Sequence, residues 1–138
     1  MWIAYALLSA LFAALTAIFS KIGVANVNSN LATAIRTIVV LIMIWGIVLA
    51  KGEAKDLGSL SKQNLLFLVI SGIATGLSWI FYFKALKIGN VSQVAAVDKL
   101  SIALVVVFSI IFLKEELTLK AALGAGLIVV GTIVLALK

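Results

Sequence analysis

The sequence predicts an all-α integral membrane protein, and three observations carry this prediction. First, 64% of the 138 residues are hydrophobic and only 12% are charged, whereas a soluble domain has roughly 45–50% apolar and about 25% charged residues. Second, several apolar runs reach the length of about 20 residues that a helix needs to cross roughly 30 Å of hydrocarbon. Third, no proline interrupts these runs, and in lipid each span must satisfy its own backbone hydrogen bonds.

Five spans are expected, in one domain that covers residues 1–138. The first span, about 2–24, begins MWIAYALL without a basic N-terminal region, so we expect it to be retained and not cleaved as a signal peptide. The polar segment NVNSN (26–30) separates it from the second span, about 31–50. Asn28, Ser29 or Asn30 can cap the second helix.

The remaining spans are expected at about 64–86, 91–113 and 119–137. The one long charged loop, KGEAKDLGSLSKQN (51–64), precedes the first of these. The connectors KIGN (87–90) and KEELT (114–118) are short, which favours antiparallel packing of the helices that they join. Thr118 can cap the last helix.

Composition argues against several classes of function. Because the chain has no cysteine and no histidine, we expect no disulfide, no metal site and no histidine-based acid–base chemistry. It also lacks a phosphate-binding loop and any nucleophile–base spacing, so neither an enzyme nor a bound cofactor is expected. The net charge is +6 but no basic run is present, so we expect the lipid bilayer, and no nucleic acid, as the partner.

Loop cations give almost no preference for one orientation in the membrane. Five spans place the two termini on opposite sides, and the basic residues divide nearly evenly between those sides. One side has Lys51, Lys55, Lys62, Lys114 and Lys120; the other has Lys21, Lys84, Lys87 and Lys138, with Arg36 and Lys99 inside spans but nearer to it. Either one orientation still dominates, or the chain inserts both ways.

Small polar side chains recur on one face of two spans, at helical spacings of three, four or seven. These residues are Tyr5, Ser9, Thr16 and Ser20 in the first span, and Ser71, Thr75, Ser78 and Tyr82 in the third. Such stripes either pack helices closely, through hydrogen bonds of about 0.6 kcal/mol each, or line a polar cavity. Both interpretations remain open at this point.

Charges inside the spans favour the cavity. A charge near the bilayer centre costs about 2.5–3.5 kcal/mol on insertion scales, and Asp98 lies roughly 10 Å deep at 1.5 Å per residue. Side chains at neighbouring positions of a helix do not face each other, so we expect that Lys99 does not neutralise Asp98. Arg36, water, a cationic substrate or a proton would then do so. Asp98 is either a substrate or proton-coupling site, or half of a structural ion pair.

The last span is expected to pack against another helix or to form a dimer. Ala122 and Gly126 make a small-xxx-small pair, and Gly124 and Gly131 lie seven residues apart on one face. This span also has no charge in its interior, which favours packing over a role as a cavity wall.

Two long stretches combine these features in a fixed order. WIAYALLSALFAALTAIFSKIGVANVNSNLATAIRTIVVLI has a first helix that ends in a lysine-bearing turn, followed by an arginine early in the second. SWIFYFKALKIGNVSQVAAVDKLSIALVVVFSIIFLKEELTLKAALGAGLIVVGTIVLAL adds an aromatic–Ala–Leu turn, a helix of small residues, a Glu-Leu-Thr connector and a glycine-rich final helix. The order of these features resembles the EamA domain of the drug/metabolite transporter superfamily, and VDKLS (97–101) is similar to a subgroup of its small single-domain members.

The resemblance implies a secondary-active transporter of a small metabolite or drug-like solute, multi-pass in the cytoplasmic (inner) membrane of a prokaryote. Larger members of the family carry two inverted five-helix units, so this single unit is expected to need an oppositely oriented partner. The near-even charges would let a second copy form an antiparallel homodimer; a paralogous partner is the alternative. Related small multidrug carriers have a glutamate in the first helix, which this chain lacks, so multidrug export is in doubt unless Asp98 has taken over that role.

We therefore expect Asp98 to be the coupling or substrate-charge group, with proton coupling as the hypothesis. Lys99 and Arg36 are candidate anion or counter-ion contacts, in a cavity lined by the first, third and fourth spans. The further candidate wall residues are Tyr5, Ser9, Ser78, Trp79, Tyr82 and Gln93. Two alternatives remain, which are a lipid or lipid-linked-sugar flippase subunit and a non-transporting membrane scaffold subunit.

Overall fold

The computed structural model describes residues 1–137, and every regular element in that range is helical. Five helical segments are long and apolar enough to cross a membrane, which confirms the prediction of an all-α membrane protein with five spans. Lys138, one of the cations counted above, lies outside the described residues. The chain forms two compact units, Ser20–Lys87 (the α2–α3 unit) and Met1–Phe19 with the chain from Ile88 onward (the α4–α6 unit).

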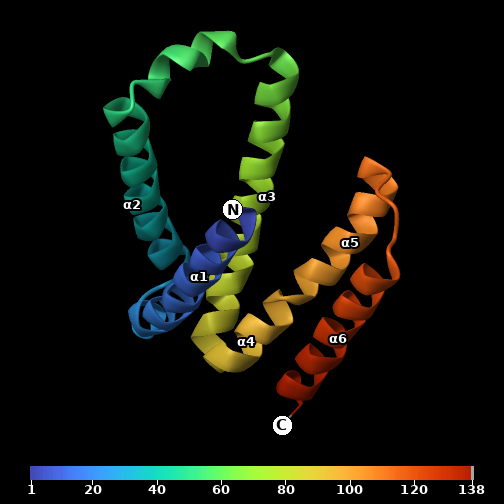
Figure 1. Cartoon of the computed structure of the whole chain (residues 1–138). Coiled ribbons are helices and arrows are strands. Elements are labelled where there is room, and N and C mark those ends of the chain that lie inside the picture. The colour runs from blue at the N-terminus through green and yellow to red at the C-terminus, as the bar shows by residue number, and fades with distance from the viewer. Residues whose placement is uncertain (138) are drawn as a thin grey trace. The chain divides into compact units, whose positions relative to one another are not determined.

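The α2–α3 unit contains the end of α1 and two long helices joined by a short one (Figure 1). Its elements are α1 (Trp2–Val24) from Ser20 onward, α2 (Ser29–Ala50), the 3₁₀-helix η1 (Glu53–Ser59) and α3 (Lys62–Ile88). Asn28 caps α2, because its side-chain oxygen accepts a hydrogen bond from the Asn30 amide at 2.9 Å. Gly52 has a φ of 68° after α2, a left-handed conformation that glycine adopts without a steric penalty.

Two lysines hold the ends of α1 and α3 in the same unit. The ammonium of Lys21 donates a hydrogen bond to the carbonyl of Leu86 at 2.6 Å, and that of Lys87 donates to the carbonyl of Val27 at 2.8 Å. Carbonyls at a helix C-terminus lack helical partners and carry the negative end of the helix dipole. This applies to Leu86, in the last turn of α3, whereas Val27 lies in the connector after α1. The reciprocal pair of bonds, called the lysine clamp below, ties the end of α1 and its connector to the end of α3.

The α4–α6 unit contains α1 up to Phe19 and three further helices. They are α4 (Val91–Asp98), α5 (Leu100–Leu113) and α6 (Leu119–Ala136). α6 packs against both α4 and α5, and the short connector at 114–118 brings α5 and α6 side by side (Figure 1). Thr118 caps α6 as predicted, because its hydroxyl oxygen accepts from the Ala121 amide at 3.2 Å.

The fourth span, expected as one helix, contains a break at Lys99. α4 ends at Asp98 and α5 begins at Leu100, and the Lys99 amide donates to the Ala96 carbonyl at 3.0 Å, three residues back and not four. No proline or glycine lies in this stretch. The break therefore comes from local hydrogen bonding and side chains, because no residue there forces it sterically.

Thr132 of α6 satisfies part of this break, and its loss is expected to weaken the unit. The buried Thr132 hydroxyl donates to the Ala96 carbonyl at 3.1 Å, and irregular backbone at membrane depth needs such partners. Thr132→Val keeps the shape and removes the bond, so we expect a loss of about 0.6 kcal/mol, up to roughly 1.7. The measurement is the free energy of unfolding in mixed micelles, with Thr16→Val as control; equal effects of the two changes would contradict the prediction.

The C-terminus of α5 has an unusual residue. Lys114 has a φ of 55°, and its amide and that of Glu115 both donate to the Ser109 carbonyl, the latter at 3.3 Å. This is a left-handed helix cap, a place where glycine is the usual residue. A lysine therefore occupies a backbone conformation that its Cβ disfavours.

The residues predicted as packing or dimer positions on α6 differ in exposure. Gly124 is half-buried, whereas Ala122, Gly126 and Gly131 are exposed. A Cβ added at any of the three glycines would meet no atom within 4 Å in the described part of the chain. Packing within this part of the chain does not require glycine there, and the dimer role remains a prediction.

Candidate functional site

Arg36 is the only charged residue in the first three turns of α2, and it lies against aromatic rings of α3. Its guanidinium carbon is 4.3 Å from the centroid of the Trp79 ring and 5.5 Å from that of Phe83. Trp79 and Phe83 are four residues apart, so they project from one face of α3. Cation–π contacts of this kind contribute about 0.5–2 kcal/mol, and they fix the position of the guanidinium.

Apart from these rings, the guanidinium interacts electrostatically with Tyr82, and it has no hydrogen-bond or ion-pair partner among residues 1–137. The ion pairs of that range are Lys51–Glu53 and Lys99–Asp98, and Arg36 makes no hydrogen bond within it. A guanidinium has five N–H donors and no acceptor. The half-buried Arg36 side chain can therefore donate to water or to a ligand.

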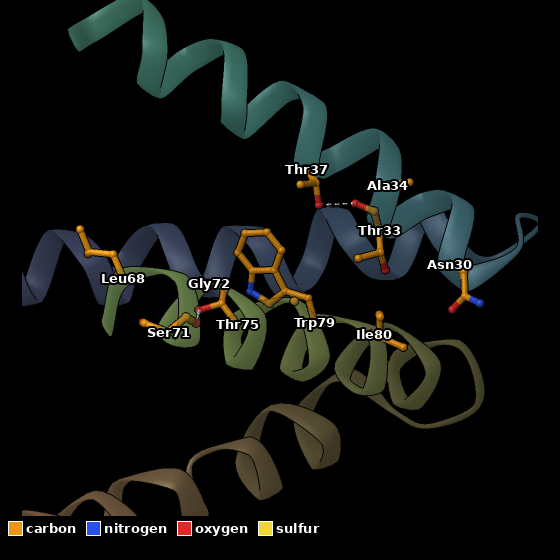
Figure 2. A pocket seen from close by; sticks show the side chains of 11 residues that line it. Asn30, Thr33, Ala34, Thr37, Leu68, Ser71, Gly72, Thr75, Trp79 and Ile80 are labelled. Atoms are coloured by element: carbon orange, nitrogen blue, oxygen red, sulfur yellow. Dashed lines mark hydrogen bonds between the residues drawn. The ribbon is translucent and has the colours of Figure 1, made fainter. Parts of the chain in front are cut away.

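A groove of about 670 Å³ lies between α2 and α3, next to this stack. It is lined by Asn30, Thr33, Ala34, Thr37, Leu68, Ser71, Gly72, Thr75, Gly76, Trp79 and Ile80. Figure 2 shows the Trp79 indole projecting from α3 into the space toward α2. Trp79 is therefore shared, since it lines the groove and also carries the guanidinium of Arg36.

The threonines of the groove present acceptors and not donors. Thr33 donates its hydroxyl proton to the Ser29 carbonyl at 2.8 Å, and Thr37 to the Thr33 carbonyl at 2.8 Å. Thr75 donates to the Ser71 carbonyl at 2.9 Å; this bond and the Thr37 bond are dashed in Figure 2. A hydroxyl has one proton, so these three oxygens retain only lone pairs for a solute.

Asp98 and Lys99 form an ion pair at the break between α4 and α5. Lys99 Nζ lies 3.6 Å from Asp98 Oδ2, and their side chains are 54% and 38% exposed. The expectation that Lys99 does not neutralise Asp98 was wrong. It assumed that neighbouring side chains cannot meet, whereas the long, half-exposed lysine side chain brings its ammonium within reach of the Asp98 carboxylate.

The other predicted site residues are distributed between the two units. Tyr82 is half-buried and meets the Phe83 ring edge-on, with centroids 6.5 Å apart, in the unit that holds Arg36 and Trp79. Gln93 is half-buried in the α4–α6 unit, and its side-chain oxygen accepts from the Asn90 amide group at 3.3 Å.

The remaining candidates are exposed. Ser78 is exposed on α3, and Tyr5 and Ser9 are exposed on α1, with Tyr5 74% accessible. Their roles as wall residues remain predictions. Among the described residues no cluster of three or more potential metal-ligating side chains occurs.

Sequence reasoning missed several residues of the groove and its surroundings. The second span was not expected to form a wall, yet Thr33 and Thr37 line the groove. Phe83 was missed as well, although its spacing from Trp79 placed two aromatic rings on one helical face. Lys21 and Lys87 were counted only as loop charges, but they form the lysine clamp.

Comparison with known proteins gives a consistent result. The model of the EamA-like transporter family matches residues 1–137. A Sinorhizobium protein described as an uncharacterized transporter in the cobO 3′ region is 50% identical over 135 residues, covering 98% of this chain and 96% of that protein. An uncharacterized protein of Methanocaldococcus jannaschii is 30% identical over 132 residues, covering 96% and 93% of the two chains. No solved structure matches the chain.

Proposed function

Because the chain belongs to the EamA-like transporter family, we propose that it is a secondary-active carrier of a small metabolite or drug-like solute. The family and the five apolar helices establish a multi-pass membrane protein with a transporter role. The proposal adds that it works by alternating access, as a dimer, in the cytoplasmic membrane.

The ion pair at the break in the fourth span carries the proposal of proton coupling. Discontinuous spanning helices commonly hold the substrate and coupling-ion sites of secondary transporters. Asp98 and Lys99 lie at such a break, and both remain accessible. Protonation of Asp98 would cancel its attraction for Lys99, which links proton binding to the geometry of the break.

The dimer follows from the number of spans. A single unit of five spans has its termini on opposite sides, so an inverted repeat requires a second, oppositely oriented chain. The near-even cations allow a second copy to insert that way. The exposed Ala122 and Gly126 of α6, four residues apart on one face, are the proposed contact, because small residues let helices approach closely. A paralogous chain is the alternative partner.

Reconstitution tests the proposal. Liposomes containing the purified chain are given a defined mixture of amino acids, small carboxylates, polyols and quaternary amines, and accumulated solutes are quantified by mass spectrometry. We expect an imposed proton gradient to drive accumulation of at least one solute, and a protonophore to stop it. If no solute moves but a labelled phospholipid is flipped with or without the gradient, the flippase alternative replaces the carrier.

A further inference from the structure

We propose that the groove between α2 and α3 binds a hydroxylated organic anion, with Arg36 as the anion-binding group and Trp79 as its support. The inference rests on the proposed function in one respect, because the bound anion is taken to be the solute that the carrier moves. Binding at Arg36 can nevertheless be measured without transport.

The first argument is charge balance in the α2–α3 unit. Residues 20–87 include seven basic and two acidic residues, and both acids, Glu53 and Asp56, lie in η1. Glu53 is 3.9 Å from Lys51. No acidic residue therefore occurs in α2 or α3 to balance Arg36. A bound oxyanion would supply the missing charge, and a guanidinium fork matches carboxylate or phosphate oxygens in pairs.

The second argument is the orientation of the guanidinium. A guanidinium that lies over an aromatic ring uses its flat face in that contact, while its N–H groups point outward in its own plane. Within residues 1–137 Arg36 has the ring contacts with Trp79 and Phe83 and an electrostatic interaction with Tyr82, so its N–H groups have no hydrogen-bond acceptor there. The ring contacts also hold these N–H groups in place, which reduces the entropy that an anion must overcome on binding.

The third argument is the positive electrostatic potential at one end of the groove. Asn30, which lines the groove, lies in the first turn of α2, where the helix dipole is positive. The Lys87 ammonium is 2.8 Å from the Val27 carbonyl, just before that turn. Together with Arg36 these features attract anions and repel cations. The groove is thus unsuited to the cationic solutes that the missing glutamate of the first span had already put in doubt.

The fourth argument concerns the uncharged part of the solute. The acceptor oxygens of Thr33, Thr37 and Thr75 match solute groups that donate hydrogen bonds. A solute with several hydroxyl groups satisfies them, whereas a plain fatty acid leaves them without donors. The volume of about 670 Å³ is within the range of small-molecule sites. These observations together favour a hydroxylated acid over a simple acid, a neutral polyol or an amine.

Fluorescence of Trp79 tests the inference directly. The chain has three tryptophans, so Trp2→Phe with Trp45→Phe leaves Trp79 as the only one. This protein, in nanodiscs, is titrated with four probes that share an unbranched six-carbon chain: gluconate, hexanoate, sorbitol and N-methylglucamine. We expect a saturable change of Trp79 emission with gluconate, at least tenfold weaker binding of hexanoate and sorbitol, and none of N-methylglucamine. Equal binding of gluconate and N-methylglucamine would overturn the inference.

Further substitutions in the protein that has Trp79 as its only tryptophan then show which side chains bind gluconate. Arg36→Gln is expected to weaken gluconate binding at least tenfold and Arg36→Lys less, because lysine keeps the charge without the fork. Lys55→Gln, which removes one exposed charge from η1, is the matched control and should bind as the parent does. Thr37→Val serves if Arg36→Gln does not fold, and it should weaken gluconate but not hexanoate. The inference is overturned if Arg36→Gln binds gluconate as the parent does. If Thr37→Val is the variant used, unchanged gluconate binding by that variant overturns it.

Binding and transport separate the two proposals. If gluconate binds through Arg36 but no solute enters proteoliposomes, the anion site is supported and the carrier function fails. If a solute is accumulated while no probe binding depends on Arg36, the carrier function is supported and the anion site fails.

Discussion

Asp98→Asn is expected to abolish proton-driven accumulation, with a loss of roughly tenfold or more, because a carboxamide neither binds nor releases a proton. The change preserves the size of the side chain and mimics its protonated state. Lys99 loses the partner that lies 3.6 Å away. Exchange of labelled for unlabelled solute across the membrane requires no net proton movement, so it should persist. Accumulation and exchange, measured in the same proteoliposomes, distinguish lost coupling from a lost fold.

Two further variants make this result specific. Asp56→Asn removes the exposed aspartate of η1 and should accumulate solute as the wild type does. Asp98→Asn combined with Lys99→Gln removes both charges of the pair. If Asp98→Asn alone also loses exchange, and the double variant recovers exchange but not accumulation, the loss of exchange was caused by the unpaired Lys99. Full proton-driven accumulation by Asp98→Asn alone would rule out coupling through this carboxylate.

Variants that insert in one orientation only are expected to lose solute accumulation. Co-expression of two variants with opposite orientations is expected to restore it. Glu53→Lys with Gln63→Lys adds positive charge to one side of the membrane, and Lys55→Gln with Lys62→Gln removes it from the same side. If the active form is an antiparallel homodimer, each variant alone should accumulate less than about a tenth of the wild-type amount of solute. Co-expression of the two should restore accumulation.

A thiol reporter measures the orientation itself. The chain has no cysteine, so Gly58→Cys, in exposed η1, is the only site for a membrane-impermeant thiol reagent. Wild-type orientation predicts labelling of roughly half the molecules in intact cells, and the two variants that insert in one orientation predict nearly all or nearly none. If the parent chain is labelled completely or not at all, the homodimer is parallel or the partner is another chain.

The spans and caps were predictable because they depend on local sequence. The length of an apolar run determines whether it crosses the membrane, and the residue type at a helix start determines the cap, as at Asn28 and Thr118. The break at Lys99 was not predictable by the same means. No proline or glycine marks it, and the Thr132 hydroxyl that satisfies it comes from another helix.

Only those site residues that are unusual by themselves in the sequence could be predicted. Arg36 and Asp98 stand out because each is a charge inside an apolar run. The stack of Arg36 on Trp79 and Phe83 depends on how α2 and α3 face each other, and periodicity within one helix does not determine that. Thr33 can only accept hydrogen bonds because its hydroxyl donates its one proton to the Ser29 carbonyl, and this bond is seen only in the three-dimensional structure.

Lys114 has a consequence for how the chain enters the membrane. It is the only residue other than glycine with a positive φ in residues 1–137, and a left-handed backbone costs such a residue about 1–2 kcal/mol. A cation at a helix C-terminus regains about 0.3–1 kcal/mol from the dipole, so glycine would suit the finished fold better. Its positive charge, however, acts during insertion, while the spans are still being placed across the bilayer. A strained backbone at Lys114 is what we expect if the residue is retained for its effect on membrane insertion and not for the stability of the folded chain.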